Sequence, residues 1–266
     1  MTPDRPARPT LTFGDDGTPA ADVAWLWISE HSWTGWRLEV VTVTDVPIAP
    51  PPPEEARLHP WDPPRPRHAF EETGFAEVEH LTARIDPRLA LSTPTDLLVI
   101  GPKGPGLLKG VGLGSTAEWL VQHPPSPLVV ARTGAPTRRV LAAHDGSPHA
   151  QRALTTLAGL PWVAGVELVV LTVDDGRADV DAASALVDEA LAGAPVEAVR
   201  VVATDRDPTT VILQEYRARE PDLLVLGTVG LTGWRRLRLG STAGAVARSV
   251  PGSVLLARAD VPGENP

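Results

Sequence analysis

The chain carries one glycine pattern twice, and this repeat limits its fold more than any other feature. The spacing G-x2-G-x9-G-S starts at Gly101 and again at Gly227, each time after a short apolar run. An Asp-Gly-Ser/Thr-Pro turn is also duplicated, at Asp16 and Asp145. The turns lie 129 residues apart and the glycine patterns 126 residues apart. In a chain of 266 residues, this repeat predicts two copies of one domain, which we expect to span residues 1–133 and 138–260.

The second copy alternates strand and helix patterns along its whole length. Strands are expected at residues 139–144, 166–173, 196–203, 222–226 and 253–257, and helices at 148–158, 180–191, 208–219 and 241–249. Alternation of this kind is typical of a parallel sheet covered by helices. We therefore expect an α/β fold with two tandem flavodoxin-like (HUP-type) domains. Each should have a five-stranded parallel sheet in the order 3-2-1-4-5, with helices on both faces.

The first copy follows this plan with two departures. Its strands are expected near residues 10–13, 37–43, 76–81, 97–100 and 128–131. Residues 46–67 contain nine prolines, so they cannot hold an intact second helix. An exposed crossover is the main interpretation of this segment, and a polyproline II ligand for a partner is the alternative. The third helix should be short, because Asp86 lies only ten residues before Asp96, whereas Asp207 lies fifteen before Asp222.

The duplicated motifs are expected to meet at one edge of each sheet. They follow the first and fourth strands, which are neighbours where the strand order reverses, and open α/β sheets bind ligands at that point. Glycine at 227 and 230 lets backbone amides approach a ligand without a Cβ in the way. Gly240-Ser241-Thr242 then opens a helix whose free N–H groups favour phosphate. A nucleotide fits this arrangement, although Asp145 alone could form a structural turn and Val173 could be a core residue.

Together these motifs resemble those of the universal stress proteins, in their tandem two-domain bacterial form, over nearly the whole chain. In the ATP-binding branch of that family, the aspartate after the first strand and a valine ending the second hold the adenosine end, and the glycine loop takes ribose and phosphates. The resemblance implies ATP, with or without Mg²⁺, as the ligand. The site residues it implies are Asp145, Val173, Gly227, Gly230, Gly240, Ser241 and Thr242 in the second copy and Asp16, Val43, Gly101, Gly104, Gly114, Ser115 and Thr116 in the first. Arg206 departs from the family, which often has glycine there.

Composition restricts the partners. The net charge of −9 argues against a broad contact with nucleic acid or an anionic membrane. No metal site is expected, because the chain has no cysteine and its histidines lack the spacing of a ligand pair. A polar N-terminus and the lack of an apolar run of about 18 residues predict a cytoplasmic protein. A cluster of tryptophans around the first helix is expected to pack in the core and between the copies: Trp25, Trp27, Trp33 and Trp36.

The motifs do not indicate an enzyme, since neither a G-x4-G-K-S/T phosphate loop nor a G-x-S-x-G elbow is present. The main hypothesis is a stress-response protein whose nucleotide-bound state is read by an unidentified partner protein, with at most weak ATP hydrolysis. One alternative is a slow ATPase or nucleotidyl transferase that uses Asp145 with Mg²⁺, and another is a structural scaffold with vestigial sites. The copies should pair through their last strands, 128–131 and 253–257, as an intramolecular pseudo-dimer. Two chains could in addition form a homodimer.

Overall fold

The computed structural model describes residues 8–43, 70, 73–103, 112–176, 179–204, 207–229 and 239–259. The proline-rich segment 46–67 lies outside these residues, and so do the expectations for it. The first half contains β1 (Thr10–Gly14), α1 (Pro19–Ser29), β2 (Arg37–Val43), β3 (Glu77–Ala83), α3 (Pro87–Ala90), β4 (Leu97–Ile100), α4 (Ser115–Gln122) and β5 (Leu128–Val130). The second half contains β6 (Arg139–Ala143), α5 (Pro148–Ala158), β7 (Glu167–Asp174), α6 (Val180–Leu191), β8 (Ala198–Thr204), α7 (Pro208–Arg219), β9 (Leu223–Gly227), α8 (Ser241–Ser249) and β10 (Ser253–Ala257).

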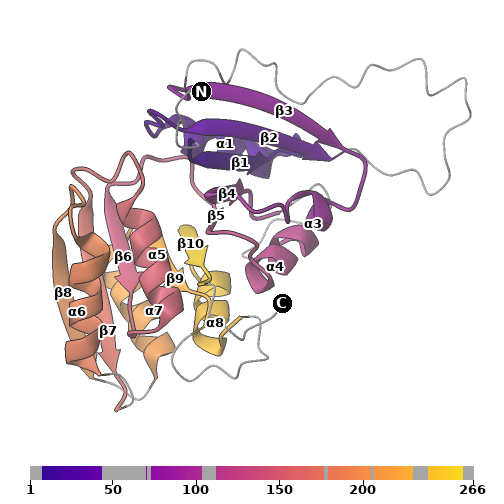
Figure 1. Ribbon diagram of the computed structural model, residues 1–266. Helices are drawn as coiled ribbons and strands as arrows, with labels where there is room; N and C mark the ends of the chain where they lie inside the picture. Colours follow the sequence, from indigo (N-terminus) through magenta and orange to yellow (C-terminus); the bar gives the residue numbers. More distant parts are fainter. Residues whose placement is uncertain are drawn as a thin grey trace, which may run out of the picture.

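The ten strands form one continuous sheet in the order β3-β2-β1-β4-β5-β10-β9-β6-β7-β8 (Figure 1). Neighbouring strands within each half are parallel. The two halves meet where β5 and β10 pair antiparallel, with Val130 opposite Val254. Each half therefore has the strand order 3-2-1-4-5, which confirms the predicted α/β fold and the predicted pairing of the last strands.

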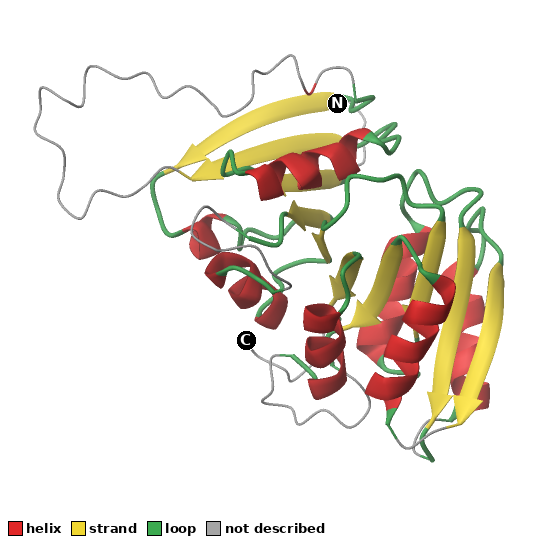
Figure 2. Cartoon of the chain, turned by 180° about the vertical axis from the view of Figure 1, so that it is seen from behind, coloured by secondary structure: helices red, strands yellow, loops and turns green. Residues whose placement is uncertain are grey.

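The core lies on both faces of the sheet. One apolar cluster joins α1, α5 and α6 to one face and includes Trp27, Leu154 and Val187. The other cluster joins α4, α7 and α8 to the opposite face and includes Leu120 and Val246. Helices therefore cover both faces, as the continuous apolar strands of a parallel sheet require (Figure 2).

The third helix of the first half is clipped, as predicted from the sequence. In α3 and α7, an aspartate caps the helix and a proline follows it at the first helical position. However, α3 has 4 residues and α7 has 12. The shorter helix covers less of the sheet, and two large apolar side chains, Ile85 just before it and Leu89 within it, are 47% and 63% exposed.

Aromatic rings from both halves pack together beside the connection between them. Trp162, which follows α5, lies 5.8 Å from Trp27 and 4.3 Å from His31, between ring centroids. The His31 Nε2 atom accepts a hydrogen bond from the Thr137 N–H at 3.0 Å, so its Nδ1 donates to the Trp27 carbonyl at 2.6 Å. Burial lowers the pKa of His31 to about 4. The predicted core packing is confirmed for Trp27, Trp33 and Trp36, which are buried, while Trp25 packs partly buried against the same apolar cluster.

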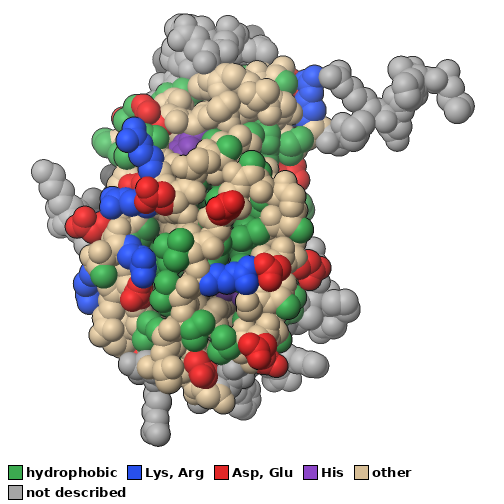
Figure 3. Space-filling model, turned by 90° about the vertical axis from the view of Figure 1, so that its left-hand side faces the viewer, with side chains coloured by type: hydrophobic (Ala, Val, Ile, Leu, Met, Phe, Trp, Pro, Cys, Tyr) green, Lys and Arg blue, Asp and Glu red, His purple; other side chains and the backbone are tan. Residues whose placement is uncertain are grey.

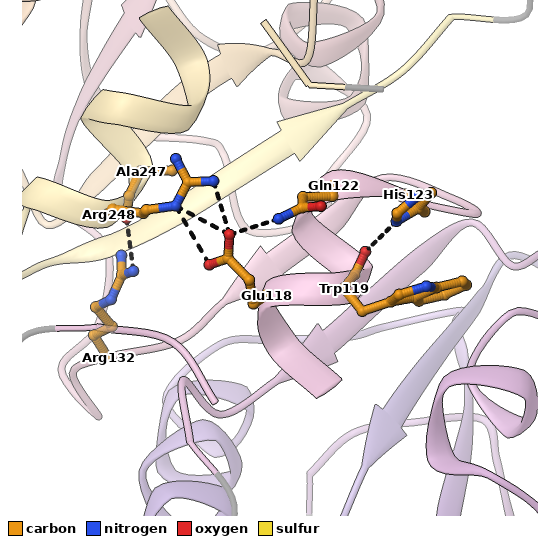
Figure 4. A network of polar contacts seen from close by, with 7 residues as sticks. All are labelled: Glu118, Trp119, Gln122, His123, Arg132, Ala247 and Arg248. Atoms are coloured by element: carbon orange, nitrogen blue, oxygen red, sulfur yellow. Dashed lines mark hydrogen bonds and ion pairs between the residues drawn. The ribbon is translucent and has the colours of Figure 1, made fainter. Parts of the chain in front are cut away.

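Polar contacts connect α4 and α8 beside the β5–β10 pair (Figure 4). Arg248 donates to Glu118 Oε1 at 2.7 Å, and Gln122 donates to the same oxygen. Arg132 donates to the carbonyl of Ala247 in the last turn of α8 at 2.7 Å. On the face drawn in Figure 3, acidic and basic side chains are interspersed and form no patch of a single sign.

Candidate functional site

The Asp145 turn follows β6 and begins α5. The Asp145 Oδ1 atom accepts a hydrogen bond from the Ser147 N–H at 3.0 Å. Gly146 has a φ of 82°, a conformation that a residue with a Cβ rarely adopts. Ser147 caps α5, because its Oγ accepts from the Ala150 N–H at 3.2 Å. The carboxylate is thus held on a tight turn at the carboxyl end of a central strand.

The first half builds the same turn with different side-chain contacts. Gly17 has a φ of 69°, and Thr18 caps α1 by accepting from the Ala21 N–H at 3.3 Å. The Asp16 Oδ1 atom accepts from the Thr18 N–H at 3.1 Å and also from the Thr18 hydroxyl at 2.6 Å. In the second half, the corresponding Ser147 hydroxyl donates instead to the carbonyl of Val229 at 3.2 Å.

That Ser147 bond joins the Asp145 turn to the glycine loop. Val229 lies two residues after the end of β9, whose neighbour in the sheet is β6. The loop is also closed on itself, since the Gly240 N–H donates to the carbonyl of Thr228 at 2.6 Å. Both predicted motifs therefore meet between two neighbouring strands at the point where the strand order reverses.

The two helices that follow the glycine loops begin without a side-chain cap. Gly240 is the N-cap of α8 and Gly114 is the N-cap of α4, and neither supplies a side-chain hydrogen bond. Gly114 repeats the loop closure of the second half, with its N–H 2.8 Å from the Pro102 carbonyl oxygen. The next residues of each helix are exposed or half-buried: Ser241 and Thr242 in α8 and Ser115 and Thr116 in α4. The first-turn N–H groups of both helices can therefore receive an anion.

Gly227 and Gly101 have a packing role that the sequence did not predict, and the predicted approach of their loops to a ligand stays a prediction. A Cβ on Gly227 would lie 2.7 Å from the carbonyl carbon of His149 and closer still to the nitrogen of Ala150. A Cβ on Gly101 would lie 2.6 Å from the carbonyl carbon of Ala20. In both halves the missing side chain lets the first turn of a helix, α5 or α1, rest on the end of the neighbouring strand. This contact positions the aspartate turn, which comes just before that helix.

The two predicted valines lie at strand ends and contribute to apolar packing. Val173 is 8% exposed, and it belongs to the same apolar cluster as Leu226 at the end of β9. Val43 is half-buried against the same cluster in the first half. Gly104 and Gly230 lie outside the described residues, as does Arg206.

Sequence reasoning considered the residue before each aspartate only as a charge or as a metal ligand, and did not predict its burial or its contact within the turn. Asp15 and His144 are each 2% exposed. The His144 ring accepts from the Gly146 N–H through Nδ1 at 3.3 Å, and its Nε2 lies 3.2 Å from Gln151 Oε1. Burial lowers the pKa of His144. A polar residue directly after an apolar strand was the available signal, but its burial depends on tertiary packing.

Within the described ranges, no group of three or more His, Asp or Glu side chains is arranged to hold a metal ion. Among the same residues, no helix is long and apolar enough to cross a membrane.

The comparisons with known proteins agree on one family. The sequence model of the universal stress protein family matches residues 176–258. The chain is 31% identical over 201 residues to the universal stress protein Slr1230 of Synechocystis sp., covering 72% of this chain and 69% of the relative. It is 28% identical over 226 residues to a universal stress protein of Mycolicibacterium smegmatis, covering 72% of this chain and 76% of the relative. A crystal structure of a universal stress protein from Archaeoglobus fulgidus superposes with a TM-score of 0.68 at 19% identity, covering 94% of this chain and 98% of that one.

Proposed function

Because the chain belongs to the universal stress protein family, we propose that it is a tandem, nucleotide-binding member that holds ATP between the aspartate turn and the glycine loop. The observation that supports this proposal is the Ser147–Val229 hydrogen bond, which joins the Asp145 turn to the described start of the glycine loop. The Asp145 carboxylate can accept from the hydroxyl or amino groups of a nucleoside. The N-terminus of α8 offers N–H groups to phosphate.

The residues of the structure fit such a ligand chemically. An N-cap glycine leaves the first turn of α8 without a competing side-chain acceptor. A helix N-terminus carries a partial positive charge of about half an elementary charge, which stabilises an anion. Mg²⁺, if it accompanies the nucleotide, would neutralise phosphate charge. The carboxylate that would hold the ion is that of Asp145, in the turn.

The two halves are expected to bind unequally, with the second half tighter. The Thr18 hydroxyl donates to Asp16 Oδ1, so a ligand must compete with that bond. The Ser147 hydroxyl instead donates to the Val229 carbonyl and holds the start of the loop before a ligand arrives, which should reduce the ordering entropy lost on binding. Titration calorimetry of Asp145→Ala and Asp16→Ala should show that the first change removes the tighter site. Retention of the tighter site in Asp145→Ala would contradict this order.

Binding without efficient turnover is the main proposal, and the slow ATPase or nucleotidyl transferase is the alternative. A third reading is a scaffold with vestigial sites. We propose that residues 1–133 and 138–260 act as the two domains of one cytoplasmic molecule, and that its nucleotide-bound state is read by another protein.

Small molecules that copurify with the protein test the proposal directly. Mass spectrometry of the released fraction should identify an adenine nucleotide, and linear ADP production over many turnovers would favour the ATPase alternative. Saturating ATP should also raise the melting temperature, since a ligand at 100 times its dissociation constant stabilises the folded state by about 2.7 kcal/mol. If ATP, ADP and AMP all leave the transition unchanged, the scaffold reading is favoured.

A further inference from the structure

One hydrogen bond recurs in both halves although the side chain that makes it differs. The Asp15 Oδ1 atom accepts the Gly17 N–H at 3.1 Å, and the His144 Nδ1 atom accepts the Gly146 N–H at 3.3 Å. Both acceptors precede a site aspartate by one residue, and both are 2% exposed. The two glycines share the left-handed conformation, with φ of 69° and 82°. A carboxylate and an imidazole therefore hold the same turn.

The second half fixes the tautomer that this bond requires. Because His144 Nδ1 accepts, the ring proton lies on Nε2, where Gln151 Oε1 at 3.2 Å can accept it. Gln151 belongs to α5, the helix that Ser147 caps. The His144 backbone N–H donates to the Leu171 carbonyl of β7 at 2.9 Å, so the residue is anchored at both backbone and ring.

Apolar packing does not explain this pair of residues. An aspartate and a histidine differ in volume, shape and charge, and a buried polar group costs free energy unless it is hydrogen-bonded. What the two side chains share is an acceptor atom within reach of the N–H two residues ahead. This is the property that an Asp or Asn uses to hold a turn.

We propose that His144 and Asp15 are positioning residues for the ligand-binding turns. Each holds its glycine in the left-handed conformation and so aims the following carboxylate, Asp145 or Asp16, at a hydrogen-bond donor of the bound nucleoside. The inference rests on the proposed function, because it assigns these residues to the same site. It predicts that the second turn needs an acceptor at position 144 and does not need an imidazole.

Three variants of one residue test this requirement in the full chain. His144→Ala removes the acceptor, whereas His144→Asn and His144→Asp keep one, the latter reproducing the residue of the first half. All three are made in an Asp16→Ala background, so that calorimetric titration with ATP reports on the second site. Loss of one hydrogen bond should weaken binding about five-fold in His144→Ala. His144→Asn should bind within about two-fold of the parent.

The melting temperature of each unliganded variant separates positioning from folding. If His144→Ala and His144→Asn are destabilised equally but only His144→Ala loses affinity, the positioning role is supported. If both lose affinity equally, the acceptor is not what matters and the proposal is overturned.

Amide hydrogen exchange at Gly146 tests the turn without any ligand. The Gly146 amide should be protected in the parent and in His144→Asn, and should exchange faster in His144→Ala. Equal protection in all three overturns the inference. A parent protein that binds no adenine nucleotide overturns the proposed function instead, and the exchange result then decides the role of His144 alone. Asp15→Ala and Asp15→Asn repeat the comparison at Gly17.

Discussion

His31 makes the junction between the halves sensitive to acid. Its ring contacts Trp27, Trp33 and Trp162, which carry no charge, and burial lowers its pKa from 6.5 to about 4. The unfolded chain therefore takes up the proton first as the pH falls. The free energy of unfolding is therefore unaffected by His31 above about pH 6.5. It falls progressively as the pH is lowered towards 4, by up to about 3 kcal/mol in total.

Denaturant unfolding at pH 7 and pH 4.5 checks this expectation. His31→Gln can still accept from the Thr137 N–H but does not titrate, so the stability of that variant should depend less on pH. An identical loss of stability in the parent and in His31→Gln would show that other groups cause the acid sensitivity.

Close packing against α5 requires a residue without a side chain at position 227. Gly227→Ala places a methyl group against the backbone of His149 and Ala150, which cannot move as a flexible side chain does. The expected loss is about 2–3 kcal/mol in the free energy of unfolding. Gly159→Ala is the matched control, because its Cβ would meet only ordinary contacts, the nearest at 3.5 Å. Equal stability of the two variants would contradict the packing role.

The elements of the second half could be predicted well from the sequence, because local signals agree there with the fold. Helices α5, α6, α7 and α8 have the predicted bounds, and the first three begin at a serine or aspartate whose side chain caps the helix. The bounds of β10 are as predicted, but those of the other four strands differ by one or two residues, for example Ala198–Thr204 against the predicted 196–203. Strand ends carry no comparable cap, so they depend on the neighbouring strand.

The candidate site was predicted in outline and not in its internal contacts. The repeat located both turns and both glycine loops, and the strand order brought them together. The sequence could not reveal that α5 fills the space at Gly227 or that the Ser147 hydroxyl reaches Val229. These contacts join residues about 80 positions apart, and they follow only from the packing of a helix against the sheet.

Ser147 couples helix α5 to the glycine loop, so its removal should have two effects. Ser147→Ala removes the N-cap and should destabilise the fold by about 1 kcal/mol. It also removes the bond to Val229, and should therefore weaken nucleotide binding in addition. Asp207→Ala removes the N-cap of α7 as a control, and should lower stability without changing affinity. Equal affinities of the two variants would exclude the coupling.

At the scale of the whole molecule, Trp162 is the second half's contribution to the aromatic junction. Its ring packs on Trp27 and His31 of the first half, and Trp162→Ala should cost about 2–3 kcal/mol. Because the contact joins the halves, the calorimetric transition should broaden or separate into two. Trp119→Ala is the control, since Trp119 stacks on His123, the C-cap residue of its own helix α4, and not on the other half. A single sharp transition in Trp162→Ala would show that the β5–β10 pair alone keeps the halves cooperative.

The antiparallel β5–β10 pair has a further consequence, which concerns dilution. Two separate subunits joined along such an edge come apart when their concentration falls below their dissociation constant. Here both edges belong to one chain, so the effective concentration of one half near the other is set by the short connection between them. The paired state should therefore persist at copy numbers too low for a two-chain assembly. The fraction of each half that holds the proposed nucleotide should then not depend on the abundance of the protein.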